Sequence, residues 1–160
     1  MSRRRESTAG TGVPTGWTLR RARWSELDAI TAYEILRLRS RVFVLEQDCV
    51  YEDPDGRDLE SGARHLWLED GDGSIGAYLR VLTEGAAVRL GRIVTDPRHR
   101  SGGLAARLIS EALGDHGDGP VVLDAQLHLR AWYERFGFAA DGEPFDEDGI
   151  MHLPMRRDGR

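Results

Sequence analysis

The chain has 160 residues, of which 40% are hydrophobic and 31% are charged, and its formal net charge at pH 7 is -5. This length suits one domain with a single substantial core, and a second domain is not expected. The composition is that of an ordinary globular protein, and no apolar run approaches the roughly 20 residues that a membrane span needs.

The first 16 residues are typical of a disordered tail. They carry Arg3, Arg4 and Arg5, followed by Ser, Thr, Gly and Pro, and they lack the apolar core of a signal peptide. A nucleic-acid-binding tail is the alternative, which the acidic net charge disfavours. The lone cysteine, Cys49, cannot form an internal disulfide, so no oxidising compartment is implied and we expect a cytoplasmic protein.

The first elements after this tail are a strand and a long helix. An alternating run over 17–22 predicts the strand, and residues 25–28 predict the start of the helix, with Ser25 as its N-cap. An apolar stripe with mixed spacing of three and four continues through Glu46, and we expect a break near Ser40.

A long acidic loop and three strands come next. Residues 46–60, which we call the acidic loop, hold seven acids and one base, and Pro54 and Gly56 exclude a regular element there. Glycine-containing turns then separate runs that are typical of an antiparallel meander. These strands are expected at 63–69, 74–83 and 86–95.

The second half of the chain begins with a helix. Its apolar face starts at Leu104, and we expect it to stop at Gly114. A strand over 121–123 completes a β-α-β unit, and a short amphipathic helix then ends at Gly137. The closing strands are expected at Phe138 and over 149–155.

The most informative motif is Arg-Ser-Gly-Gly-Leu-Ala at 100–105, which we call the cradle. It follows a strand broken by Asp96 and Pro97, and it opens a helix. Its small residues let backbone N–H groups converge on an anion, and the helix adds the positive end of its dipole. The spacing excludes both the P-loop and the G-x-G-x-x-G fingerprint, and it leaves R-x-x-G-x-A. An ordinary glycine turn is the alternative.

This spacing resembles the acetyl-coenzyme A pyrophosphate loop of the GNAT N-acetyltransferase superfamily, with Arg100, Gly103 and Ala105 at its defined positions. The segment 133–138, Tyr-Glu-Arg-Phe-Gly-Phe, is similar to the Y-x-x-x-G-F signature on the last helix of that superfamily. Gln126, seven residues before Tyr133, stands where many relatives have Asn.

Further motifs resemble the ElaA-like branch of the superfamily. They read Arg39-x-x-Val42-Phe43-Val44-x-Glu46-Gln47, Asp55-Gly56-x-Asp58, His65-Leu66, Leu90-Gly91-Arg92-Ile93, Gln126-x-His128-Leu129 and Glu147-Asp148-Gly149-Ile150-x-His152. Met151 departs from the branch, which usually has proline there, and the pair Gly102-Gly103 shifts the small residues of the loop slightly.

The resemblance covers most of the chain and implies one GNAT domain over 17–157. It implies an α/β (α+β) fold, with a mixed central sheet of about six or seven strands flanked by about four helices. It also implies acetyl-coenzyme A as the cofactor, with no metal. The expected cofactor contacts are Ile93, Val94, Arg98, Arg100, Ser101, Gly102, Gly103, Leu104, Ala105, Ala106, Gln126, His128 and Tyr133.

Acetyl transfer to an amine needs a polarised carbonyl group, a deprotonated amine and a protonated thiolate. Backbone N–H groups near Val94 can hold the carbonyl oxygen if its strand splays from the strand at 121–123. Tyr133 can protonate the thiolate, because a phenol with a pKa of about 10 is protonated at neutral pH, and its superfamily role is the same. A purely structural aromatic is the alternative for Tyr133.

The general base is less well determined. The candidates are His65, His128, His152, Glu46 and Glu147. His152 is favoured because it lies in the 147–152 signature and because imidazole changes charge near neutral pH, although a structural histidine is an equal alternative. Cys49 is rejected as a nucleophile, since no His-Asp neighbourhood activates it, and we expect direct transfer in a ternary complex.

Two acidic clusters bear on the acceptor, the acidic loop and residues 141–148. They favour a cationic acceptor, a primary amine of a small molecule or peptide, with Glu46 and Glu147 as contacts. Simple solvation of both loops is the alternative. We expect no nucleic acid or membrane partner, and the sequence leaves open whether the protein is a monomer or a homodimer.

Two other functions stay open. A non-catalytic acyl-coenzyme A sensor would keep the cradle and be indifferent to substitutions at Tyr133 and His152. An enzyme similar to acyl-homoserine lactone synthases is suggested loosely by residues 39–43, although the Tyr133 signature fits N-acetylation better.

Overall fold

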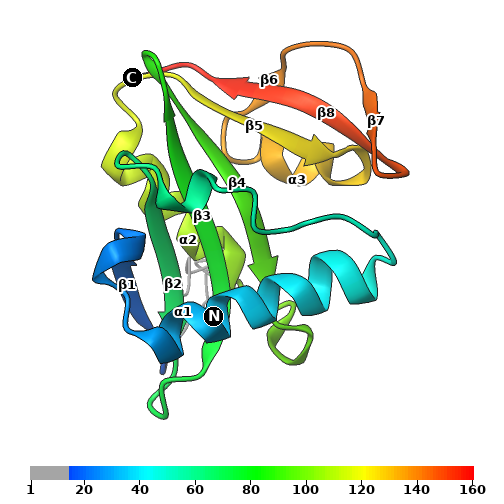
Figure 1. Cartoon of the computed structure of the whole chain (residues 1–160). Coiled ribbons are helices and arrows are strands. Elements are labelled where there is room, and N and C mark those ends of the chain that lie inside the picture. Colours follow the sequence, from blue (N-terminus) through cyan, green and yellow to red (C-terminus); the bar gives the residue numbers. More distant parts are fainter. Residues whose placement is uncertain (1–14) are drawn as a thin grey trace, which may run out of the picture.

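The computed structural model describes residues 15–160, and the basic triplet of the predicted tail lies outside them. The described residues form one mixed sheet of eight strands in the order β1-β2-β3-β4-β5-β8-β6, with β7 paired on β8 (Figure 1). The strands are β1 Thr18–Ala22, β2 Arg64–Glu69, β3 Ile75–Glu84, β4 Ala87–Thr95, β5 Val121–Gln126, β6 Ala139–Ala140, β7 Phe145–Glu147 and β8 Ile150–Arg157.

The same residues contain three α-helices, whereas about four were expected. The sheet has eight strands, whereas about six or seven were expected. The helices are α1 Ala29–Arg39, α2 Leu104–His116 and α3 Arg130–Glu134. A π-helical stretch, Ser40–Glu46, which we call the π segment, continues α1 directly, so the break expected near Ser40 is a widening of the helix. None of the helices within 15–160 is both long and apolar enough to cross a membrane.

Three helix boundaries differ from the sequence-based expectation. Asp28 rather than Ser25 caps α1, because its side chain accepts a hydrogen bond from the N–H of Thr31 at 2.7 Å. The helix α2 passes through Gly114 to His116, since the apolar side chains before it are anchored in the core and outweigh the roughly 1 kcal/mol that an internal glycine costs. The helix α3 ends earlier than expected, at Glu134.

The two faces of the sheet are covered by different helices (Figure 1). Alternation along β3 sends Ala77, Leu79 and Val81 into the core with α2, and it sends Tyr78 into a second core with α1 and the π segment. Because both faces are covered, β3 is buried along most of its length and lacks a polar face. The sheet therefore forms the middle layer of the molecule.

The strands β4 and β5 are parallel and linked by α2, but they stay paired for only two residues. The register matches Val88 with Val121 and Arg89 with Val122, and no pairing between them follows. Beyond Arg89 the two strands diverge in Figure 1, so the edge of β4 that faces β5 carries unpaired peptide groups. The splay that the sequence analysis required for carbonyl binding near Val94 is present.

Candidate active site

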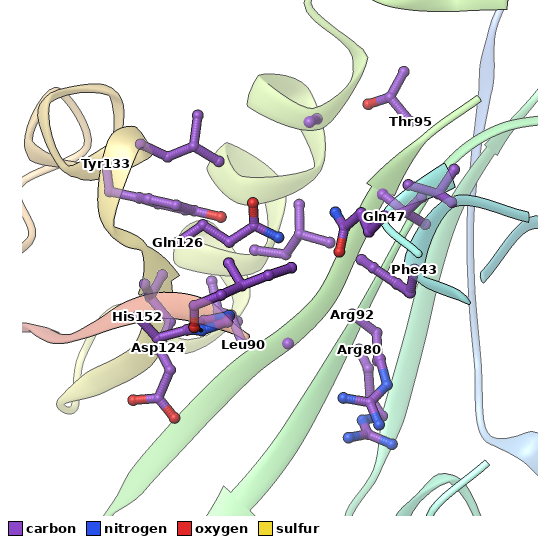
Figure 2. A pocket seen from close by; sticks show the side chains of 18 of the residues that line it. Phe43, Gln47, Arg80, Leu90, Arg92, Thr95, Asp124, Gln126, Tyr133 and His152 are labelled. Atoms are coloured by element: carbon purple, nitrogen blue, oxygen red, sulfur yellow. Dashed lines mark hydrogen bonds between the residues drawn. The ribbon is translucent and has the colours of Figure 1, made fainter. Parts of the chain in front are cut away.

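A cavity of about 1090 Å³ lies where β4 and β5 separate. The cradle and the start of α2 form one wall, and the second half of β4 forms another. Opposite them lie the end of β5, the side chain of Tyr133 from α3 and that of His152 from β8 (Figure 2). The π segment and the acidic loop border the cavity on the remaining side.

The cradle has the backbone geometry of an anion site. Ser101 and Gly103 both have positive φ angles, 67° and 77°, and no side chain caps α2 at Gly103. The N–H groups of the first turn of α2 are therefore free to bind an anion, and the helix dipole favours a negative charge there. Most of the residues predicted to bind the cofactor in this segment line the cavity, namely Arg100, Ser101, Gly103, Leu104, Ala105 and Ala106.

The strand β4 bends next to the cavity. Its pairing with β3 contains one extra residue between Gly91 and Val94, and Arg92 in this bulge has a φ of 50°. Ile93 and Val94 follow the bulge and line the cavity, with the side chain of Val94 buried in the α1 core. The backbone of this stretch, rather than its side chains, is therefore what the cavity can use for hydrogen bonding.

Tyr133 is both a core residue and a cavity residue. Its ring packs edge-on against Trp132 at 4.9 Å between ring centroids, and only 6% of the residue is exposed. Figure 2 shows its hydroxyl pointing into the cavity. Burial raises the pKa of Tyr133 to about 12, so the phenol is protonated and can donate a proton.

His152 lies opposite Gln126 in the pairing of β5 with β8, and both side chains line the cavity. Its Nδ1 lies 2.8 Å from the carbonyl oxygen of Ile150, and its ring stacks on Phe145. A carbonyl oxygen only accepts, so Nδ1 carries a proton, and the lone pair of the neutral imidazole is then on Nε2. Nε2 lies 3.9 Å from Oε2 of Glu147.

A family model described as "Acetyltransferase (GNAT) domain" matches residues 39–158. The chain belongs to the GNAT acetyltransferase family. Members of this family use acyl-coenzyme A and act on amine acceptors, and the matched region contains the cradle, the bulge and both Tyr133 and His152.

Individual relatives place this GNAT protein in the ElaA-like branch. It is 46% identical to a UPF0039 protein of Mycobacterium tuberculosis over 145 residues, which are 88% of this chain and 93% of that protein. It is 38% identical to protein ElaA of Escherichia coli over 143 residues, 84% of this chain and 92% of ElaA.

Solved structures agree with this placement. The crystal structure of E. coli ElaA superposes with a TM-score of 0.82 at 35% identity, covering 89% of this chain and 99% of ElaA. An acyl-CoA N-acyltransferase from Pseudomonas aeruginosa superposes with a TM-score of 0.84 at 38% identity, covering 88% of this chain and 99% of that one. The predicted fold class is therefore confirmed.

The structure corrects the sequence-based interpretation of the two arginines expected to add charge to the cradle. Arg98 does not line the cavity, because its Nη2 pairs with Oδ2 of Asp96 at 2.9 Å. Arg100 lines the cavity, but its Nη1 and Nη2 contact the two carboxylate oxygens of Glu46 at 2.6 and 2.8 Å. Gly102 also lies outside the cavity lining. The free N–H groups at the start of α2 are therefore the groups of the cradle that carry no partner of their own, and cofactor contacts of Arg98 and Arg100 stay predictions.

The same ion pair changes the role expected for Glu46. The hydrogen bond from Arg100 holds the pKa of this carboxyl below its usual range, so Glu46 is an ionised partner of Arg100, and its contact with the acceptor stays a prediction. Glu147, the other predicted contact, lines the cavity and is largely exposed.

Two histidines that were considered as bases differ in position. His65 is fully buried, does not line the cavity, and uses both ring nitrogens: Nδ1 with the hydroxyl of Tyr78 at 2.6 Å and Nε2 with the carbonyl of Asp58 at 3.0 Å. Burial lowers its pKa, so it is a neutral structural residue. His128 lines the cavity from the turn before α3 and stays a predicted cofactor contact.

Cys49 also borders the cavity, at the end of the π segment. Its Sγ lies 3.5 Å from the carbonyl oxygen of Gln47 and 3.4 Å from that of Asp148, so the thiol donates to backbone. It is buried and ties the acidic loop to the turn between β7 and β8. This arrangement agrees with the expectation that Cys49 is structural.

The acidic loop is not a free cluster of negative charge. Asp53 and Asp58 are buried against the guanidinium of Arg39, which is itself fully buried, and Asp55 pairs with Arg80 and Arg92. We call this set the buried ion network: Arg39, Asp53, Asp55, Asp58, Arg80 and Arg92. Three of the seven acids of the acidic loop are therefore paired with arginines of this network.

Sequence reasoning missed the role of Asp53 and Arg80. The usable signal was an arginine in the middle of the otherwise apolar strand β3, because a charge on a strand covered on both faces requires buried partners. The partners of Arg80 lie in the acidic loop, more than 20 residues earlier in the chain.

Proposed function

We propose that this GNAT protein is an acetyl-coenzyme A-dependent N-acetyltransferase that transfers the acetyl group directly to a primary amine in a ternary complex. The observation that supports this most is the single cavity that joins the cradle, the unpaired edge of β4, the Tyr133 hydroxyl and the His152 ring. A donor and an acceptor bound in that cavity would meet between these groups.

The residues of the cavity fit acetyl-coenzyme A. The uncapped first turn of α2, with positive φ angles at Ser101 and Gly103, would hold the pyrophosphate through backbone N–H groups. The unpaired edge of β4 at Ile93 and Val94 would hold the pantetheine arm and the thioester carbonyl, with Gln126 and His128 on the opposite wall. The bound thioester supplies the acetyl group and a thiolate leaving group.

The chain's own groups would then move two protons. His152 takes a proton from the ammonium of the acceptor at Nε2, because Nδ1–H is engaged by the carbonyl of Ile150. The β4 N–H groups stabilise charge that develops on the carbonyl oxygen. Tyr133 donates its hydroxyl proton to the departing sulfur, a role for which its raised pKa keeps it protonated. The second proton that the nitrogen loses on forming the amide returns to the Tyr133 oxygen, and the proton on His152 leaves to solvent.

The acceptor side of the cavity suits an ammonium group. Glu52, Glu147 and Asp148 line it, together with the aromatic rings of Phe43 and Tyr51. Negative side chains and aromatic faces both attract a cation. We therefore propose a primary amine of a small molecule or peptide as the acceptor.

A screen of the purified protein with acetyl-coenzyme A against an amine library, read by thiol release, tests this function. Turnover on an amine is expected, and Tyr133→Phe should lower kcat by about 100-fold or more, as the loss of a general acid does. Tyr33→Phe is the matched control, because Tyr33 is an exposed residue of α1 outside the cavity. Cofactor binding without turnover on any amine would favour the sensor instead.

The order of transfer is tested separately. Direct transfer predicts intersecting initial-rate lines and retained activity in Cys49→Ala. Parallel lines together with a trapped acetyl group on Cys49 would overturn the ternary complex.

A further inference from the structure

The bulge in β4 is held in a conformation that its residue does not favour. Arg92 has a φ of 50°, which an L-residue with a side chain adopts at an energetic cost. It is the extra residue between Gly91 and Val94, and the register of β4 against β3 shifts there. Such a conformation persists only when surrounding contacts impose it.

The shortest of those contacts come from Asp53, and a longer one joins Nη2 of Arg92 to Oδ2 of Asp55 at 3.4 Å. Nε of Arg92 lies 2.8 Å from Oδ1 of Asp53, and Nη2 of Arg92 donates to the backbone carbonyl of Asp53 at 3.0 Å. The guanidinium of Arg92 also lies over the ring of Tyr51, 5.7 Å from its centroid. A side chain in the acidic loop therefore fixes a strand residue that lies 39 positions later in the chain.

Asp53 is itself fixed from the other side. Its Oδ2 accepts a hydrogen bond from Nε of Arg39 at 2.8 Å, and its carbonyl oxygen accepts one from Nη2 of Arg39 at 3.2 Å. Both residues are almost completely buried, and Arg39 is the last residue of α1. One carboxylate thus links the end of α1 to the bulge through two guanidinium groups.

The position of the bulge gives this link a consequence for chemistry. Ile93 and Val94 come directly after Arg92, line the cavity and belong to the stretch of β4 that no longer pairs with β5. The N–H of Val94 faces β3, in the same direction as that of Asp96, which donates to the carbonyl of Gly76, so the N–H on the cavity edge is that of Ile93. A change in φ at Arg92 would re-aim this group. Donors of this kind act only when they are aimed at the oxygen on which charge develops.

We propose that Asp53 is a positioning residue for acyl transfer, which acts through Arg92 by holding the β4 bulge and thereby aiming the N–H group of Ile93, which faces away from β3. The inference rests on the function proposed above. A purely structural Asp53 is the competing explanation, because any break in the buried ion network would lower stability.

Asp53→Asn and Asp58→Asn separate the two explanations. Both remove a buried carboxylate that Arg39 binds, but the Asp58 side chain contacts Arg39 and Arg80 and not Arg92. Both variants should unfold at lower urea concentration. Only Asp53→Asn should lower kcat, by about tenfold or more, with a smaller change in the KM for acetyl-coenzyme A. Equal kcat values in the two variants would overturn the proposal.

Glycine at position 92 provides a rescue test. Glycine adopts a φ of 50° without the penalty of a side chain, so Arg92→Gly should keep more activity than Arg92→Ala. In the Arg92→Gly background, Asp53→Asn should have little further effect on kcat, because the side chain through which Asp53 contacts β4 is already absent. A full additional loss of kcat would show that Asp53 does not act through Arg92.

Amide hydrogen exchange and NMR shifts of Ile93 and Val94 give a readout that needs no activity. Asp53→Asn should change both, Asp58→Asn should change neither, and the Asp53→Asn change should vanish in the Arg92→Gly background. If the wild-type protein acetylates no amine but these amide changes occur, the proposed function fails and the positioning link stands. If acetylation occurs but the amides do not respond, the positioning link fails alone.

Discussion

The two faces of the central sheet are stabilised by different physics. The face that packs on α2 buries a continuous apolar cluster, from Leu66 and Leu79 to Leu108 and Ile109. The face that packs on α1 buries a smaller apolar cluster together with the buried ion network and His65. The apolar face sets the fold, whereas the charged face also fixes a long loop and a strained bulge beside the cavity.

This difference predicts which single substitution costs most. Arg39→Met should destabilise the protein by about 3–5 kcal/mol, because it leaves Asp53 and Asp58 buried without their common partner. The midpoint of urea unfolding measures the loss. A variant within 1 kcal/mol of the wild type would mean that the network contributes little to folding.

A truncation on the apolar face should cost slightly less and leave the site intact. Leu108→Ala removes a fully buried side chain of α2 and should destabilise by about 3 kcal/mol through lost burial and a cavity. Its kcat at a temperature where the variant is folded should match the wild type. A large fall in kcat would contradict the separation of the two faces.

Only the charged face should respond to pH. Although burial alone would raise it, hydrogen bonds from Arg80 lower the pKa of Asp55 from 3.8 to about 2, and the resulting stabilisation, which solvent screens in part, is present above about pH 4 and lost as the pH falls through about 2. His65, whose pKa burial lowers, should cost stability already below about pH 6.5, since the unfolded chain binds its proton more readily. Urea midpoints measured from pH 8 to pH 2 check both steps.

The matched variant for that experiment is Asp55→Asn. It should flatten the loss of stability near pH 2 that is assigned to Asp55, and it should leave the loss below about pH 6.5 that is assigned to His65. An unchanged lower step would assign the acid sensitivity to other carboxylates.

The smallest expected loss of stability comes from removing a single methylene group on the apolar face. Ile109→Val should cost about 1 kcal/mol, with no change in the shape of the pH profile, because Ile109 is fully buried among apolar side chains. Thermal unfolding at two pH values is sufficient to measure it. A pH-dependent effect would show that the faces are coupled.

The sequence predicted the elements of the apolar face well, because periodicity carries the information there. The strands around Leu66 and Leu79 and the helix that starts at Leu104 were expected within a few residues of their observed bounds. The errors lie at helix ends whose positions depend on side-chain contacts, such as the cap at Asp28 and the continuation of α2 through Gly114. Local propensity does not report such contacts.

The candidate site was predicted in part. The cradle and Tyr133 follow from local motifs, and the structure brings them to one cavity with His152. The pairing of Arg100 with Glu46 joins residues 54 positions apart. The sequence analysis had predicted Arg100 as a cofactor contact and Glu46 as an acceptor contact. Ionic partners of this kind are set by the fold and not by spacing along the chain.

The sequence by itself determined the order of the strands and helices and the small-residue turn at the cradle, because both depend on apolar periodicity and on backbone rules that act within a few residues. Only the tertiary structure decided where the charges of the acidic loop go. Asp53 reaches Arg39 and Arg92 because α1 and the β4 bulge meet over one face of the sheet, and burial there leaves each charge no alternative to a charged partner.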